Sequence, residues 1–169
     1  MSVKIIVDST ADLTDDIKSQ MEVVPLTLRF GEEEYIDDVT IKHKEFYEKL
    51  IETDVLPTTS QPTPAAFAEV FQKTVDAGDK AVVVTISSKL SGTYQSATIA
   101  AEDFPESVYV VDSKNAAIGT GILAELGLKL AKEGKPAEEI AEELTNEREN
   151  ICLIAMLDTL EYLKKGGRI

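Results

Sequence analysis

Three runs of the chain are apolar and β-branched at nearly every position, without the alternation of polar and apolar residues that half-exposed strands show. They lie at 3–7, 81–86 and 108–111. Such runs are typical of strands that are buried on both faces of a parallel sheet. A fourth run at 151–156 is a further strand candidate, although its leucine and methionine residues also suit a helix.

Segments with helical spacing of apolar residues alternate with these strands. The predicted helices are 15–21, 43–52, 64–77, 92–102, 116–133, 136–147 and 159–165. Thr14 and Thr63 stand where hydroxyl side chains cap helix N-termini, and Gly78 stands where a glycine ends a helix. Strands that alternate with helices predict an α/β fold with a mostly parallel sheet flanked by helices.

Two segments depart from this simple alternation. Residues 23–30 and 34–36 flank Gly31 and predict a hairpin or an edge pair, with Pro25 at an edge or bulge because it lacks an N–H group. The segment 116–124 is small or apolar on nearly every side, and its two glycines disfavour a helix. It is either a tightly packed core helix or a surface that another domain or a ligand approaches closely.

Composition narrows the class of protein. The chain has 169 residues, enough for one domain with a core, and a single cysteine, which fits a reducing cytoplasm. Neither an apolar stretch of membrane-spanning length nor a secretory signal pattern is seen, so no stable membrane insertion is expected. The net charge of −14 argues against nucleic acid as a partner.

Hydroxyl side chains gather where the predicted strands end, which is the edge at which parallel α/β sheets bind ligands. The sharpest case is Ser91-Gly92-Thr93, at the expected start of a helix. Unpaired N–H groups, a serine hydroxyl and a glycine that admits a ligand suit a carboxylate or phosphate there. The turn Thr59-Ser60-Gln61 has similar chemistry. Each turn has a plainer reading too, as a helix cap or a rigid loop.

Catalytic chemistry finds less support in the residues. His43 is the only histidine, and neither a G-x-S-x-G elbow nor a glycine-rich phosphate loop is present. Asp8 and Asp112 follow predicted strands and offer an alternative function, a metal-assisted hydrolase or phosphotransferase. Asp8 also suits a simpler role, as an acceptor for nearby backbone N–H groups.

Five segments together resemble the DegV family of bacterial lipid-binding proteins. They are VDSTADL at 7–13, TTSQPTP at 58–64, ISSKLSGTYQSA at 86–97, VVDSK at 110–114 and LEYLKKGGRI at 160–169. The resemblance covers the whole chain in order. It implies a Rossmann-like three-layer lobe, residues 1–169, that is the first of two lobes, the second being absent from this chain.

The resemblance also implies a function. Family members hold one long-chain fatty acid between their lobes, and Thr59 and Ser91 would hydrogen-bond its carboxylate, with Ser60, Gly92 and Thr93 completing the pocket. A histidine from the second lobe contributes near the head group, and His43 does not match it. The family implies a carrier without enzymatic activity and without a cofactor, which presents the fatty acid to a dihydroxyacetone-kinase-like fatty acid kinase for conversion to acyl phosphate.

Two further expectations follow from that resemblance. The smooth segment 116–124 would form one wall of the acyl trough, so a bulky residue at Gly121 should weaken lipid binding and leave the fold intact. A lobe that lacks its partner would be functionally incomplete, and its exposed partner surface would drive self-association.

Overall fold

A four-stranded, fully parallel sheet forms the centre of the molecule, in the strand order β2-β1-β6-β7. The computed structural model describes residues 2–53 and 55–169. The four strands are β1 (Val3–Asp8), β2 (Glu22–Val24), β6 (Lys80–Thr85) and β7 (Val108–Asp112). The two central strands, β1 and β6, are the β-branched runs with the deepest burial, because helices cover both of their faces.

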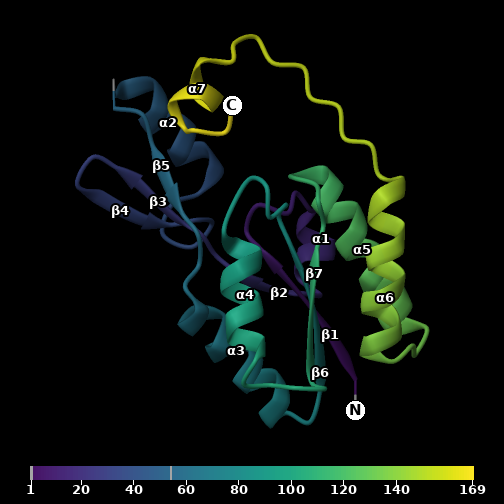
Figure 1. The fold of residues 1–169 in the computed structure, drawn as a ribbon. Helices are drawn as coiled ribbons and strands as arrows, with labels where there is room; N and C mark the ends of the chain where they lie inside the picture. Colours follow the sequence, from purple (N-terminus) through teal and green to yellow (C-terminus); the bar gives the residue numbers. More distant parts are fainter. Residues whose placement is uncertain (1, 54) are drawn as a thin grey trace.

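Two helical layers flank this sheet, as Figure 1 shows. Helices α3 (Pro64–Asp76) and α4 (Thr93–Ala101) cover one face, whose core includes Ile6 and Val83. Helices α5 (Ile118–Lys132) and α6 (Ala137–Glu147) cover the other face, over Ile5 and Val82. Adjacent residues of a strand point to opposite faces, so both faces of β1 and β6 are apolar. The predicted α/β fold with a mostly parallel sheet flanked by helices is confirmed.

A small antiparallel sheet stands beside the main one, in the order β4-β3-β5. It consists of β3 (Thr27–Phe30), β4 (Glu33–Ile36) and β5 (Thr58–Ser60), and helix α2 (His43–Glu52) follows the hairpin. Strands β3 and β4 pair antiparallel on either side of Gly31, which adopts a φ of 61° in the turn, so the predicted hairpin is confirmed. The predicted strand 23–30 is divided, however, because Pro25 separates β2 at the edge of the main sheet from β3.

The helix ends agree with the sequence in two of three cases. The Thr63 hydroxyl accepts a hydrogen bond from the Ala66 N–H at 3.2 Å, and Gly78 follows α3 with a φ of 78°. Thr14 precedes α1 (Asp15–Lys18), but its side chain makes no capping hydrogen bond and the helix stops short of residue 21. Thr14 therefore occupies the expected N-cap position, but without the capping hydrogen bond, and the helix is shorter than predicted.

The strand predicted at 151–156 is also wrong. After α6 and the short helix η1 (Arg148–Asn150), this segment has no regular secondary structure and lies outside both sheets. Most of it is exposed, including Met156 at 97%. Figure 1 shows it running across the molecule to α7 (Glu161–Lys165). Within residues 2–53 and 55–169, no helix is long and apolar enough to cross a membrane.

Candidate functional site

The loops after β1, β6 and β7 meet at one edge of the main sheet. Asp8 ends β1 and Asp112 ends β7, and β6 lies between these two strands. Ile86 and the residues up to Gly92 connect β6 to α4 at this edge. Right-handed parallel crossovers bring these carboxyl ends together, which is why strands distant in sequence contribute to one site.

Asp8 is fully buried and binds the backbone of two loops. Its Oδ2 accepts a hydrogen bond from the Ile86 N–H at 2.8 Å, and its Oδ1 accepts one from the Thr10 N–H at 2.9 Å. Burial raises the pKa of the Asp8 carboxyl above its ordinary value, although the hydrogen bonds from Thr10 and Ile86 act in the opposite direction. The expected role of Asp8 as a backbone acceptor is confirmed.

Ser9, the next residue, links the main sheet to the small one. Its hydroxyl accepts a hydrogen bond from the Leu26 N–H at 3.0 Å, and its own N–H donates to the Val24 carbonyl at 3.2 Å. Leu26 leads directly into β3, whose partner β5 carries Thr59. The loop after β1 therefore helps to place the turn at Thr59.

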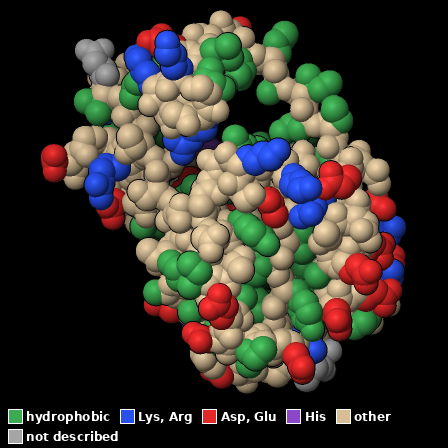
Figure 2. Space-filling view, viewed as in Figure 1, with side chains coloured by type: hydrophobic (Ala, Val, Ile, Leu, Met, Phe, Trp, Pro, Cys, Tyr) green, Lys and Arg blue, Asp and Glu red, His purple; other side chains and the backbone are tan. Residues whose placement is uncertain are grey.

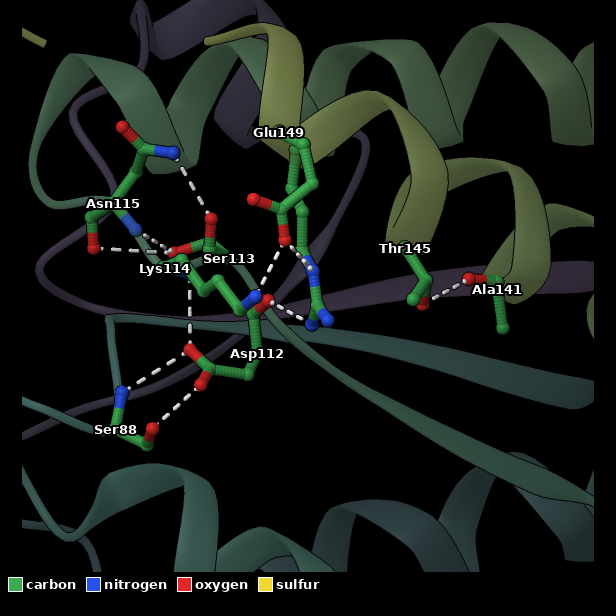
Figure 3. Close-up of polar contacts among 9 residues, drawn as sticks. Ser88, Asp112, Ser113, Lys114, Asn115, Ala141, Thr145 and Glu149 are labelled. Carbon is green, nitrogen blue, oxygen red and sulfur yellow. Dashed lines mark hydrogen bonds and ion pairs between the residues drawn. The ribbon is translucent and has the colours of Figure 1, made fainter. Parts of the chain in front are cut away.

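Asp112 holds the same β6–α4 loop from the other side (Figure 3). Its Oδ1 accepts hydrogen bonds from the N–H groups of Ser88 at 3.1 Å and Lys114 at 3.0 Å, and its Oδ2 accepts one from the Ser88 hydroxyl at 2.6 Å. Both carboxylates are thus committed to backbone and hydroxyl donors. Among the residues that the structure describes, no group of three or more His, Cys, Asp or Glu side chains could hold a metal. The geometry does not favour the metal-assisted alternative.

Ser91 and Thr93 interact with each other at the start of α4. Their hydroxyl oxygens are 2.9 Å apart, and the Thr93 N–H donates to the Ser91 hydroxyl at 3.3 Å. Thr93 is buried, whereas Ser91 is partly exposed. The N-cap of α4 is Gly92 rather than Ser91, so the plainer reading of Ser91 as the helix cap was wrong.

Thr59 and Ser60 lie on the small sheet rather than in a free loop. They pair with Leu28 and Thr27 of β3, and their side chains are exposed. The two candidate turns therefore belong to different sheets, which the sequence did not indicate.

Gln61 joins the two turns. Its side-chain nitrogen donates to the Ser96 hydroxyl of α4 at 3.0 Å. A Cβ atom at Gly92 would stand 2.2 Å from the Gln61 Oε1 atom, so the glutamine amide lies directly on this glycine. We expected Gly92 to admit a ligand to the backbone, and the group that approaches it here is Gln61. The glutamine after β5 and the glycine before α4 were visible in the sequence, but their contact spans about 30 residues and was missed.

The smooth segment 116–124 packs against the chain itself. A Cβ atom at Gly121 would stand 2.3 Å from the backbone oxygen of Asp12, whose N–H donates to the Ala117 carbonyl at 3.2 Å. The side of the segment that carries Gly119, Gly121 and Leu123 is therefore tightly packed core, whereas Ile118 and Ile122 of the same segment are exposed. A bulky residue at Gly121 would meet backbone, so it would disturb this packing, contrary to our expectation. The exposed apolar side chains at the start of α5 are Ile118 and Ile122, at 54% and 52%.

The surface also has hollows that the two candidate turns do not line. One hollow of about 340 Å³ is lined by Tyr35, Ile41, Lys49 and further residues of α2, and neither of the two candidate turns contributes to it. Figure 2 shows a separate opening beneath the arch of the C-terminal segment, with Lys and Arg side chains on its lower rim. His43 lies at the start of α2, and no expected site residue shares that helix.

Comparisons with known proteins agree on one family. A family model described as "Uncharacterised protein, DegV family" matches residues 2–169. A DegV domain-containing protein of Clostridium perfringens is 36% identical over 99% of this chain, and one of Clostridium acetobutylicum is 39% identical over 99%. The chain spans 61% of the length of each of these two relatives.

Solved structures share the fold. A DegV family protein from Thermus thermophilus, described for its fatty-acid binding, superposes with a TM-score of 0.86 at 36% identity. A DegV family protein from Eubacterium eligens loaded with heptadecanoic acid superposes with a TM-score of 0.84 at 29% identity. The alignments cover 99% of this chain and 60% and 61% of those proteins. The resemblance drawn from the five motifs is confirmed, and this chain belongs to the DegV family.

Proposed function

We propose that this chain binds a long-chain fatty acid and holds its carboxylate between the turn at Thr59 and Ser60 and the turn at Ser91, Gly92 and Thr93. The observation that carries the proposal is the Gln61 bridge, which brings the end of β5 to the start of α4. The fatty-acid ligands of the solved relatives support the same class of ligand.

The hydroxyl pair at the start of α4 suits a carboxylate. When the Thr93 hydroxyl donates to Ser91, the hydrogen of the Ser91 hydroxyl is free to donate to a ligand. The first N–H groups of a helix lack intrahelical partners and carry a partial positive charge, which stabilises an anion. Thr93 therefore orients Ser91, and the helix supplies the electrostatic complement. On β5, the exposed Thr59 hydroxyl provides a donor to the carboxylate. Ser60 contributes through its backbone, because its side chain points to the other face of the strand.

The acyl chain requires an apolar surface near this head-group site. Ile118 and Ile122 stand one helical turn apart and expose their side chains at the start of α5. In Figure 1 this end of α5 lies at the same edge of the main sheet as the β6–α4 loop. We assign the acyl contact to these isoleucines in place of Gly121, which is covered by the loop after β1.

The wider role is a further part of the proposal. Residues 1–169 form one lobe, and a second lobe in the longer protein completes the pocket and covers the acyl chain. The protein is a cytoplasmic carrier without a cofactor of its own, and it presents the fatty acid to a dihydroxyacetone-kinase-like fatty acid kinase. The support is the family resemblance and the length of the relatives.

Binding is tested by native mass spectrometry of the full-length encoded protein, followed by titration with a long-chain fatty acid. We expect a co-purifying mass in the fatty-acid range and saturable binding. Ser91→Ala and Thr59→Ala should each weaken binding by about 1–3 kcal/mol, because a buried carboxylate loses a donor. Thr58→Ala is the control, since adjacent side chains of a strand point to opposite faces. An empty protein that does not bind fatty acid on titration would overturn the proposal.

A further inference from the structure

We propose that Asp8 and Asp112 are positioning residues that hold the β6–α4 loop from both sides and so fix Ser91 for ligand binding. The inference rests on the proposed function, because Ser91 matters only if it contacts the ligand. It gives a role to two buried carboxylates that the binding site itself does not use.

Asp8 and Asp112 accept hydrogen bonds from the β6–α4 loop, and they lie on the two strands that flank β6. Asp8, at the end of β1, accepts the Ile86 N–H at 2.8 Å. Asp112, at the end of β7, accepts the Ser88 N–H at 3.1 Å and the Ser88 hydroxyl at 2.6 Å. Figure 3 shows the Asp112 side of this arrangement. Residues 86 and 88 are therefore held, and Ser87 lies between them.

Ser87 transmits this restraint to Ser91. The Ser87 N–H donates to the Asn115 carbonyl at 2.8 Å, which ties the loop to the segment before α5. The Ser87 carbonyl in turn accepts the N–H groups of Leu90 at 2.9 Å and Ser91 at 3.1 Å. Ser91 is therefore hydrogen-bonded to Ser87. The two sequence neighbours of Ser87, residues 86 and 88, are themselves hydrogen-bonded to Asp8 and Asp112. A displacement of residues 86–88 moves the Ser91 hydroxyl with it.

The hydrogen bonds to both oxygens of the buried Asp8 side chain indicate a structural role for this carboxyl group. Burying a carboxyl group raises the free energy of the folded state unless its oxygens are hydrogen-bonded. An apolar residue would fill the same space without that cost. A carboxylate accepts stronger hydrogen bonds from N–H groups than a neutral oxygen does. Among the described residues, both carboxylates accept hydrogen bonds from donors in loops, and neither accepts one from Ser91 or Thr93.

The position of Asp112 allows a graded test in the full-length encoded protein. Asp112→Asn keeps an oxygen for the Ser88 and Lys114 N–H groups, and its amide nitrogen can donate to the Ser88 hydroxyl in place of accepting from it. Asp112→Ala removes every one of these contacts. We expect fatty-acid affinity to fall by about 5- to 100-fold in Asp112→Ala and by less than about 3-fold in Asp112→Asn.

Asp8 has no such conservative replacement, because both of its oxygens accept from N–H groups. The amide nitrogen of Asp8→Asn cannot accept, so either Ile86 or Thr10 loses its partner. We expect a fall in affinity of about 5- to 100-fold and faster hydrogen exchange at the amide that loses its acceptor.

Two controls separate the possible outcomes. Val108 lies at the end of β7 that is farther from the loop, and its side chain is buried. Val108→Ala should therefore lower the free energy of unfolding without changing the loop or the affinity for fatty acid. Ser91→Ala reports on the proposed function itself. If Ser91→Ala is silent, the proposed site is wrong. If Ser91→Ala weakens binding while folded Asp8→Asn and Asp112→Ala bind normally, or if Val108→Ala weakens binding equally, the positioning role is overturned.

Discussion

At the scale of single residues, the contact between Gly92 and Gln61 decides how the two turns meet. A methyl group at residue 92 would collide with the amide of Gln61, which is the flexible end of a side chain. We expect Gly92→Ala to move Gln61, break its hydrogen bond to Ser96 and cost about 1 kcal/mol of unfolding free energy. Chemical denaturation measures that cost. In a Gln61→Ala background the same substitution should cost clearly less, and equal costs in both backgrounds would refute the contact.

The raised pKa of Asp8 gives a pH dependence of defined sign. Because its folded pKa lies above its ordinary value of 3.8, the folded protein holds this proton at pH values where the unfolded chain has lost it. The Asp8 contribution to stability therefore falls as pH rises from the ordinary value through the raised one. Urea unfolding should show the stability of the wild type declining relative to Asp8→Asn over that interval. A relative increase would mean that hydrogen bonding outweighs burial.

Sequence patterns identified individual residues only where the contact is local. Asp8 binds Thr10 two residues away, and its acceptor role followed from its place after a strand. Thr63 caps the helix that begins at the next residue and accepts the N–H group three residues ahead, which the sequence also predicts. The contact between Gln61 and Gly92 could not be predicted, because it depends on how two sheets sit against each other.

At the scale of elements, helix α5 is packed so closely against the loop after β1 that a glycine is required at position 121. The backbone oxygen of Asp12 occupies the space where a side chain at Gly121 would lie, and backbone cannot yield as a side chain can. We expect Gly121→Val to lower the free energy of unfolding by about 1–3 kcal/mol or more, as overpacking does. Thermal unfolding measures the loss. Ile122→Ala, an exposed neighbour, should change stability by less than about 0.5 kcal/mol, and equal stability of both variants would contradict this packing.

The buried strands were predictable as elements, whereas the fully exposed strand β5 was not. Continuous β-branched runs such as 81–86 are typical of central parallel strands, and they form β1, β6 and β7. The run at 151–156 has the same apolar character, but it finds no place in either sheet and stays exposed. Strand β5 has three exposed residues and pairs only through its backbone with β3, so its sequence carried no hydrophobic signal.

At the scale of the whole molecule, the C-terminal segment exposes an unusual amount of apolar surface. Ile154 and Met156 are 86% and 97% exposed, and Leu153, Leu157 and Leu160 are exposed as well. If a second lobe normally covers this surface, residues 1–169 alone should self-associate. Light scattering should give a mass above that of a monomer for residues 1–169 and the monomer mass for the full-length protein. A strictly monomeric lobe that binds fatty acid as tightly as the full protein would show that this lobe is complete.

The most direct measurement of the carboxylate clamp compares a long-chain fatty acid with the fatty alcohol of equal length, by titration calorimetry on the full-length protein. The two ligands share the acyl chain and differ in the charge of the head group. If Thr59, Ser91 and the start of α4 bind the carboxylate, the acid should bind at least about 10-fold more tightly, and Ser91→Ala and Thr59→Ala should each reduce that preference. Equal affinity for acid and alcohol in the wild type and both variants would contradict the clamp.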